Sequence, residues 1–189
     1  MNSPPCAATL KDHFLIATPS LREGFFARTV TYLCEHSENG AMGIVINQPL
    51  GVSLEEVFSS LELPLEKKRH KEKVFAGGPV QPEHGFILHE PEGDWESTLS
   101  VSDSFSLTTS RDVLMAIGEG CGPTRYLVAL GYAGWGAGQL ESELSENSWL
   151  TVKADPRVAF DIRPEDRHRE AARELGIDIG LMSGQAGHA

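Results

Sequence analysis

The alternation of apolar and polar positions divides the chain into many short segments, most of them strand-like. Runs rich in apolar and β-branched residues predict strands, because such side chains suit a pleated surface that is buried on at least one face. The predicted strands cover residues 14–17, 29–36, 42–47, 74–76, 85–89, 126–132, 149–152 and 158–162, with one or two more within 98–107.

Apolar residues three and four positions apart predict helices, because they then lie on one helical face. The predicted helices cover about 54–61, 111–117, 140–144 and 164–175. Ser53 and Glu56 have the spacing of a capping box, and Pro164 stands at the first helical position of the last helix. In that last helix Leu175 should face inward.

Asn39-Gly40 separates two of the predicted strands, 29–36 and 42–47. Asn-Gly is the strongest short-range hairpin signal, because both turn positions of the favoured turn need a positive φ. The sequence therefore predicts an antiparallel hairpin over these residues.

Strands outnumber helices, and several are joined by hairpin-like turns instead of long helical crossovers. This order predicts an α+β fold. The length of 189 residues is that of about one domain. Pro4, Pro5 and the scarcity of large apolar groups near the start predict a flexible arm over 1–12, so the single domain should span 13–189.

Charge and composition narrow the possible functions. Lys and Arg number 16 against 27 Asp and Glu, a net charge of −11, which argues against a broad DNA-coating surface. Three cysteines without a CxxC pair favour a reducing compartment. The first residues lack the basic and apolar regions of a secretory signal, and no run approaches the length of a membrane helix. We therefore predict a cytoplasmic protein without a membrane partner.

The Gly-rich segment 131–138 is the first candidate for chemistry, since a glycine loop between a strand and a helix can cradle a phosphate. The strict G-x-G-x-x-G pattern fails, because Gly134 and Gly136 match but Gln139 holds the third place. The acidic helix that follows would also repel a phosphate. The favoured alternative is a tight, close-packed turn with Trp135 in the core or at an interface.

Cys34 and His36 are two positions apart on a predicted strand and would share one face. A thiolate beside an imidazole could begin a zinc or redox site. No second ligand pair stands nearby, and His84 and His89, five apart, would lie on opposite faces of their strand. We predict a buried cysteine and a strand-end histidine, with no metal and no cofactor.

The segment that precedes the predicted helix 111–117 has two interpretations. Thr109, Ser110 and Arg111 could serve a site, but capping of the following helix explains the hydroxyls at least as well. No G-x-S-x-G elbow or familiar Cys–His pattern occurs, so we predict no catalytic residue and lean against an enzyme.

One local basic run interrupts the acidic chain, and it contains Lys67, Lys68, Arg69 and Lys71. It could contact an acidic partner or a nucleic acid. No aromatic residue is interleaved, so stacking on single strands is not indicated. A solvated loop is the simpler interpretation.

Several strings together resemble the AlgH/YqgE family of small bacterial cytosolic proteins. They are FLIATP at 14–19, RTV at 28–30, CEH at 34–36, GAMGIVINQP at 40–49, GGPV at 77–80, LTTSRD at 107–112, ALGYAGWGAGQLE at 129–141 and AGHA at 186–189. Arg22-Glu23-Gly24 departs from the Asp-Pro type of turn that the family tends to have there. The resemblance runs from about residue 13 to the C-terminus.

The resemblance implies a largely antiparallel sheet, bent or barrel-like, with helices around it. Members of that family are described as transcriptional regulators, without an established catalytic activity, cofactor or DNA-binding motif. We therefore expect a regulatory or protein-interaction module that acts through an unidentified protein partner, with direct DNA binding disfavoured by the acidic charge. The alternative is a small-ligand binder or enzyme whose pocket lies near residues 131–139.

Overall fold

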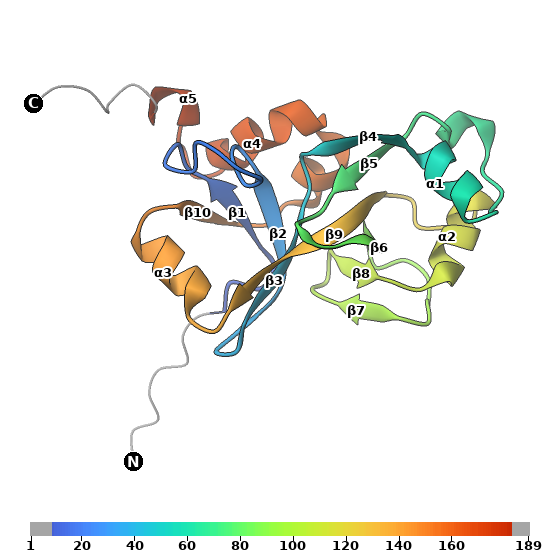
Figure 1. Cartoon of the computed structure of the whole chain (residues 1–189), viewed down its shortest axis with the longest axis horizontal. Helices are drawn as coiled ribbons and strands as arrows, with labels where there is room; N and C mark the ends of the chain where they lie inside the picture. The colour runs from blue at the N-terminus through green and yellow to red at the C-terminus, as the bar shows by residue number, and fades with distance from the viewer. Residues whose placement is uncertain (1–8, 183–189) are drawn as a thin grey trace, which may run out of the picture.

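The computed structural model describes residues 9–182, in which short helices surround one curled sheet (Figure 1). The strands are β1 (His13–Ala17), β2 (Val30–Ser37), β3 (Gly40–Val45), β4 (Pro49–Ser53), β5 (Lys73–Ala76), β6 (Val80–His89), β7 (Thr98–Ser100), β8 (Ser106–Thr108), β9 (Tyr126–Gly136) and β10 (Trp149–Lys153). The helices are α1 (Leu54–Ser60), α2 (Arg111–Gly118), α3 (Gln139–Ser145), α4 (Pro164–Arg173) and α5 (Ile179–Met182), with short helical turns η1 (Lys67–Arg69) and η2 (Arg157–Asp161).

The long strand β9 joins the two halves of the sheet. The strand order is β10-β1-β2-β3-β9-β6-β8-β7, and β5 pairs with both β4 and β9. The first part of β9 pairs with β5 and β6, and its last part pairs with β3. Every pairing is antiparallel except that of β5 with β9. The sheet curls into a half-barrel, which confirms the predicted α+β single domain with a bent, largely antiparallel sheet.

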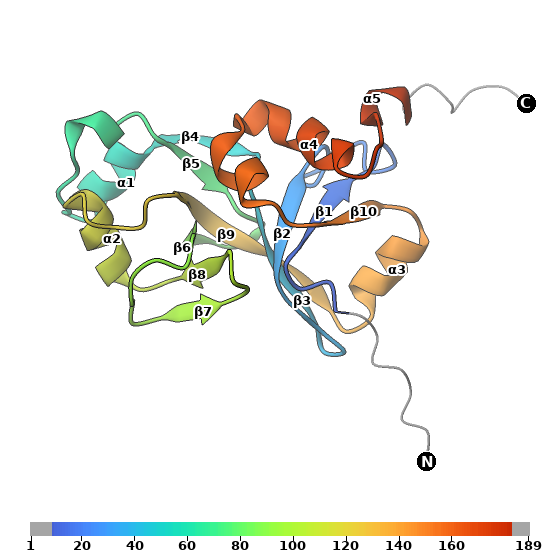
Figure 2. The same ribbon diagram turned by 180° about the vertical axis from the view of Figure 1, so that it is seen from behind.

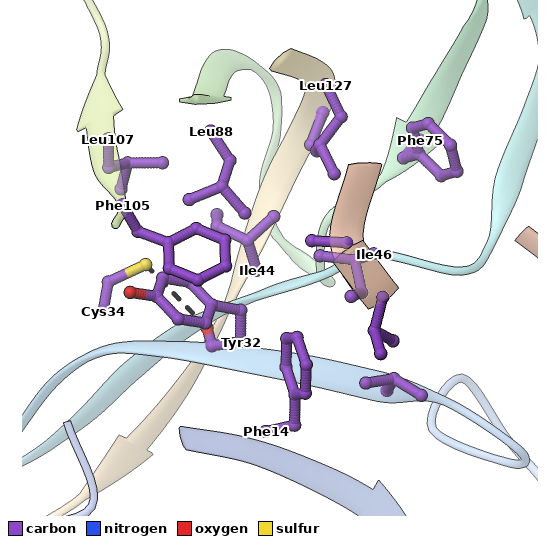
Figure 3. Packing of buried hydrophobic residues seen from close by; sticks show 14 of the residues in the cluster. Phe14, Tyr32, Cys34, Ile44, Ile46, Phe75, Leu88, Phe105, Leu107 and Leu127 are labelled. Atoms are coloured by element: carbon purple, nitrogen blue, oxygen red, sulfur yellow. Dashed lines mark hydrogen bonds between the residues drawn. The ribbon is translucent and has the colours of Figure 1, made fainter. Parts of the chain in front are cut away.

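Three apolar clusters hold the layers together. The largest lies within the curve of the sheet, where Tyr32 packs against Phe14 and Phe105 (Figure 3). A second cluster packs α3 onto the sheet through Leu140. The third packs α1 and α2 at the opposite end of the molecule, through residues such as Phe58 (Figures 1 and 2). Burial of apolar side chains in these clusters supplies the main driving force for folding.

Most local signals have the predicted result. Ser53 and Glu56 form the reciprocal capping box of α1, and Pro164 begins α4. The hairpin of β2 and β3 forms, but its turn residues are Glu38 and Asn39, because Ser37 pairs with Gly40. Only Gly40 has the positive φ, at 128°, so the glycine starts the second strand instead of ending the turn.

The Gly-rich segment is a strand and not the predicted turn, since β9 continues through Gly136. Its side chains alternate: Trp135 is buried while Gly134 and Gly136 are exposed, as expected for extended backbone. Gly131 has φ 74°, and a Cβ there would lie 2.3 Å from the carbonyl oxygen of Gly78. The glycines therefore allow close approach of neighbouring backbones, a tertiary requirement that a local pattern does not reveal.

Two C-terminal predictions are wrong. The predicted strand 158–162 is the helical turn η2, which begins after Asp155-Pro156, with the Asp155 side chain accepting a hydrogen bond from the Arg157 amide. Leu175 is exposed and not inward-facing, because α4 ends at Arg173. Ala171 and Ala172 are buried as predicted.

The end of the predicted arm 1–12 is docked. Asp12 is buried, accepts a hydrogen bond from the Tyr32 hydroxyl at 2.9 Å, and pairs with Lys153 at 2.7 Å. The amide of Leu10 donates to Nδ1 of His36 at 2.9 Å. The rest of the arm, residues 1–8, and the C-terminal residues 183–189 lie outside the described residues.

Candidate functional site

Cys34 belongs to the central apolar core. Its side chain is fully buried beside Tyr32 and Phe105 (Figure 3), and the thiol donates a weak hydrogen bond to the carbonyl of Tyr32. Burial raises the pKa of the Cys34 thiol far above its ordinary value. A protonated thiol is a poor nucleophile and metal ligand, so this position contributes packing and not reactivity.

The sequence pattern predicted that Cys34 and His36 share one face of the strand, and this prediction is wrong. The pairing of β2 with β3 shifts register between Leu33 and Glu35, which places a bulge at Cys34. A bulge reverses the alternation of side chains beyond it. His36 therefore lies on the α3 side of the sheet, where its Nε2 contacts the Glu141 carboxylate at 2.8 Å.

The hydroxyl segment before α2 serves local structure. Ser110 occupies the N-cap position without capping through its side chain, and its hydroxyl instead donates to Asp112 at 2.5 Å. Arg111 donates to the carbonyl of Leu61 at 2.8 Å, while Thr109 is exposed. This end of α2 lies at the opposite end of the molecule from α3 (Figures 1 and 2).

The Gly-rich strand ends beside α3 and forms a tryptophan cluster. The indole N–H groups of Trp135 and Trp149 both donate to Oε2 of Glu143, at 2.9 and 2.7 Å. The amide of Gly136 donates to the Gln139 side chain at 3.0 Å. The predicted site residues thus fall into three separate places: the core, the start of α2, and the β9–α3 junction.

The basic run is also divided. Lys67, Lys68 and Lys71 are exposed, as a solvated loop predicts. Arg69 instead turns toward β9, and its guanidinium donates to the Tyr126 hydroxyl at 2.6 Å. In this orientation Arg69 lines a cavity that no pattern in the sequence predicts.

This cavity of about 340 Å³, here called the arginine cleft, lies between β5, β9, η1 and the start of α4. Its charged and aromatic walls are Arg69, Glu72, Lys73, Phe75, Arg125, Tyr126, Phe160 and Arg167. Four basic side chains against one carboxylate contrast with the net charge of −11 of the whole chain. A volume above 300 Å³ is typical of small-molecule sites.

Ion pairs and hydrogen bonds hold the outer walls in place. The hydroxyl of Tyr126 donates to Glu72 at 2.5 Å, and burial together with Glu72 raises the pKa of that hydroxyl. Arg125 pairs with Glu90 at 2.5 Å and Asp161 at 2.6 Å, and lies over the Phe160 ring. Such networks fix side chains in one geometry before a ligand arrives.

Arg167 differs from the other arginines of the cleft because the nearby charge of Glu165 acts on it only from beyond ion-pairing distance. Only 5% of the residue is exposed, and no carboxylate among residues 9–182 lies within ion-pairing distance. Its Nε donates to the carbonyl of Ile162 at 2.9 Å, and another nitrogen donates to the carbonyl of Ile46. Burial lowers the pKa of Arg167 to about 10, so the guanidinium remains charged at neutral pH.

Sequence reasoning found Arg69 only as part of a basic run and missed the rest of this cleft. Arg125 and Tyr126 stand at the start of an apolar strand. A charged residue beside the end of a strand is only a weak indication of a binding site. Arg167 has no local signal at all, because α4 also contains Arg169 and Arg173, which are exposed.

Within residues 9–182, no group of three or more His, Cys, Asp or Glu side chains is arranged to hold a metal ion. No helix of the same residues is long and apolar enough to cross a membrane.

The fold and the cleft define a small α+β domain built on a curled, mostly antiparallel half-barrel. The chain belongs to the AlgH-like family, whose sequence model matches residues 14–180. It is 54% identical over 181 residues to a UPF0301 protein of Saccharophagus degradans, covering 96% of this chain and 89% of the relative. It is 49% identical over 182 residues to a UPF0301 protein of Chromobacterium violaceum, covering 96% and 98%.

Solved structures agree on the fold. The solution structure of the AlgH protein from Pseudomonas aeruginosa matches with a TM-score of 0.80 at 49% identity, covering all of both chains. A crystal structure of a protein from Corynebacterium diphtheriae matches with a TM-score of 0.71 at 19% identity, covering 97% of this chain and 94% of that one. The second likeness concerns the fold alone.

Proposed function

We propose that the protein is a binding module for a small anionic ligand, which it holds in the arginine cleft. The observation that carries this proposal is the buried guanidinium of Arg167, which lines the cleft and has no ion-paired carboxylate among residues 9–182. A buried charge is costly unless an opposite charge compensates for it. An anion bound in the cleft would supply that compensation.

The other walls suggest what kind of anion fits. Arg69 pairs with Glu72, and Arg125 pairs with Glu90 and Asp161. These carboxylates partly neutralise the two arginines, which therefore attract an anion less strongly. Arg167 and Lys73 are the two basic residues of the cleft that form no ion pair within the described residues. The rings of Phe160 and Tyr126 offer apolar surface beside them. An anion of one or two charges with a flat apolar part fits this arrangement.

This proposal places the pocket of the ligand-binding alternative in the arginine cleft and not near residues 131–139. The regulatory or protein-interaction role that the sequence predicts stays a prediction. The two roles are compatible, because a domain that changes on ligand binding can act on a protein partner. Cytoplasmic localisation and an unidentified protein partner likewise remain predictions.

Phenyl phosphate is a suitable probe, since it combines an anion with a flat ring. We expect its addition to shift the backbone NMR signals of Thr124 and Tyr126 in a saturable way, and Arg167→Met to weaken binding by roughly tenfold or more. The matched control is Arg111→Met, which removes an arginine that also lacks an ion pair but lies outside the cleft.

Saturable shifts that are equal in wild type and Arg167→Met would refute the proposal, as would no shift at the cleft with wild type. The NMR spectrum of each variant reports whether it folds. If Arg167→Met does not fold, Lys73→Met at the exposed rim provides the second test, with the same expected weakening.

A further inference from the structure

A second cavity, of about 420 Å³, shares no residue with the arginine cleft, although α4 contributes to the walls of both. It is bounded by the loop between β1 and β2 and by His168 of α4 and Ile179 of α5. We call it the loop cavity. Its side chains of interest are Leu21, Arg22, Arg28, His168 and Ile179.

The loop that forms one wall is held in place from several sides. The Asn47 side chain donates to the carbonyl of Arg28 at 2.9 Å and accepts from the amide of Val30 at 2.8 Å. Gln48 donates to the carbonyl of Phe25 at 2.7 Å, and the Thr18 hydroxyl donates to the carbonyl of Asn147 at 2.7 Å. The wall is therefore preorganised and does not need a ligand to order it.

Arg28 is held in an unusual backbone conformation. Its φ is 59°, in the left-handed region that is unfavourable for a residue with a Cβ. Such strain persists only where the surroundings enforce it, and it concentrates at functional positions. Here the clamp by Asn47 enforces it, and the result is that an arginine side chain stands at the rim of the loop cavity.

Arg22 and Arg28 have no carboxylate partner within the described residues. Six of the ten arginines form ion pairs with residues that the structure describes, as an excess of acidic residues would lead one to expect. Two of the other four stand together on this cavity. In the described part of the chain, the only side-chain bond of Arg22 is to the carbonyl of Pro19 in its own loop, at 3.3 Å.

His168 adds a hydrogen-bond acceptor to the loop cavity, whereas Arg22 and Arg28 are donors. Its Nε2 lies 2.8 Å from the carbonyl oxygen of Ala17, which can only accept, so Nε2 carries the proton. In the neutral ring Nδ1 is then an acceptor, and no residue among 9–182 donates to it. Burial and the nearby charge of Arg28 lower the pKa of His168, which favours this neutral form.

We infer that the loop cavity is a second binding site, for a small amphipathic anion. A carboxylate or phosphate group of the ligand would bind Arg22 and Arg28, whose planar forks suit either group. An apolar part would lie against Leu21 and Ile179, and a ligand hydroxyl or amine would donate to Nδ1 of His168. Because the two cavities share no residue, this inference does not rest on the arginine cleft.

The test uses 3-hydroxybutyrate and butyl phosphate as separate probes, with butanol as the uncharged control. We expect saturable NMR shifts at Leu21, Ile179 and His168 with one or both anions and none with butanol. The stronger of the two anions identifies the headgroup. Signals of Thr124 and Tyr126 report the arginine cleft, so binding at either site is distinguished from binding at the other.

The decisive variant is Arg28→Gly, because glycine accepts φ 59° without strain and should leave the fold at least as stable. We expect it to weaken binding by roughly tenfold or more. Arg28→Lys keeps a charge but not the planar fork, so it should bind with intermediate affinity. The control Arg111→Met should bind like wild type.

A folded Arg28→Gly variant that binds the anions as tightly as wild type would overturn the inference. Equal shifts with butanol and the anions would also overturn it, because they would show an apolar pocket without anion recognition. No shift at the loop cavity with either anion would do the same.

Discussion

The guanidinium carbon of Arg167 lies 5.1 Å from the centroid of the Phe75 ring, so a buried cation of α4 stacks on an aromatic side chain of β5. Both side chains line the arginine cleft. The ring faces a charge that forms no ion pair within residues 9–182, and a cation–π contact in a buried place is worth about 2 kcal/mol. The contact fixes the direction of the guanidinium and joins two elements far apart in the sequence.

This contact should be measurable as a coupling free energy between the two residues. We expect Phe75→Leu and Arg167→Met each to lower the free energy of unfolding, and the double variant to lose less than the sum by about 0.5–2 kcal/mol. Urea denaturation of wild type and the three variants gives this value. A coupling near zero would mean that Arg167 acts only through its hydrogen bonds to backbone carbonyls.

The thiols of Cys34 and Cys121 should differ sharply in reactivity. Cys121 is exposed, whereas Cys34 is fully buried and its pKa is raised by burial. Brief treatment of the folded protein with iodoacetamide, followed by peptide mass spectrometry, should show modification of Cys121 and not of Cys34. Modification of Cys34 should require urea concentrations that unfold the chain. Rapid labelling of Cys34 in the folded protein would contradict its placement in the core.

Gly131 should be far more sensitive to substitution than Gly138, although their φ angles are nearly equal. The angles are 74° and 75°, so Ala is strained by a similar amount at either place, at about 1 kcal/mol. A Cβ at Gly131 also meets the carbonyl oxygen of Gly78 at 2.3 Å, whereas nothing lies within 4 Å of a Cβ at Gly138.

We therefore expect Gly131→Ala to cost about 3 kcal/mol or more and Gly138→Ala to cost about 1 kcal/mol. Gly51→Ala is a second control, because that position has neither a contact within 4 Å nor a positive φ. Thermal or urea denaturation ranks the three variants. Equal losses at Gly131 and Gly138 would show that the close crossing of β9 over the segment at Gly78 is not tight in solution.

Acidification should destabilise the fold below about pH 6.5, before most carboxylates titrate. Burial lowers the pKa of His89 and of His168 below the ordinary value of 6.5. Between the lowered pKa and 6.5 the unfolded chain binds more protons than the folded one, so the free energy of unfolding rises with pH there and is lost as pH falls.

We expect His89→Gln and His168→Gln each to flatten this pH dependence, as measured by urea denaturation across the range. The matched control is His84→Gln, since His84 is exposed on β6 and should keep the wild-type profile. A steep loss that persists when both buried histidines are replaced would assign the effect to other groups.

The elements that local chemistry specifies were predictable. The capping box of α1, Pro164 at the start of α4 and the hairpin around Asn39-Gly40 each depend on residues a few positions apart. The apolar run 158–162 fits a strand or a buried helical turn equally well in the sequence, and in the structure it is the helical turn η2. Its helical form depends on the preceding Asp155-Pro156.

The candidate sites were less predictable, because their residues come together only in the folded chain. The bulge at Cys34 separated two residues that strand alternation placed on one face. Arg69, Arg125 and Arg167 lie on one cavity although about a hundred positions of sequence divide the first from the last. The sequence also shows that carboxylates are abundant, but it does not show which arginines lack a carboxylate partner.

The sequence by itself determined the fold class, the single domain, the family and the negative net charge, because these follow from periodicity, local turn chemistry, composition and recurring strings. Only the tertiary structure decided that the Gly-rich segment is a strand, that Cys34 is buried in the core, and that arginines without an ion pair among the described residues line two cavities. The physical reason is the separation along the sequence over which each effect acts. Periodicity and capping act within a few residues. Burial, close backbone approach and charge compensation depend on which distant segments meet in the fold.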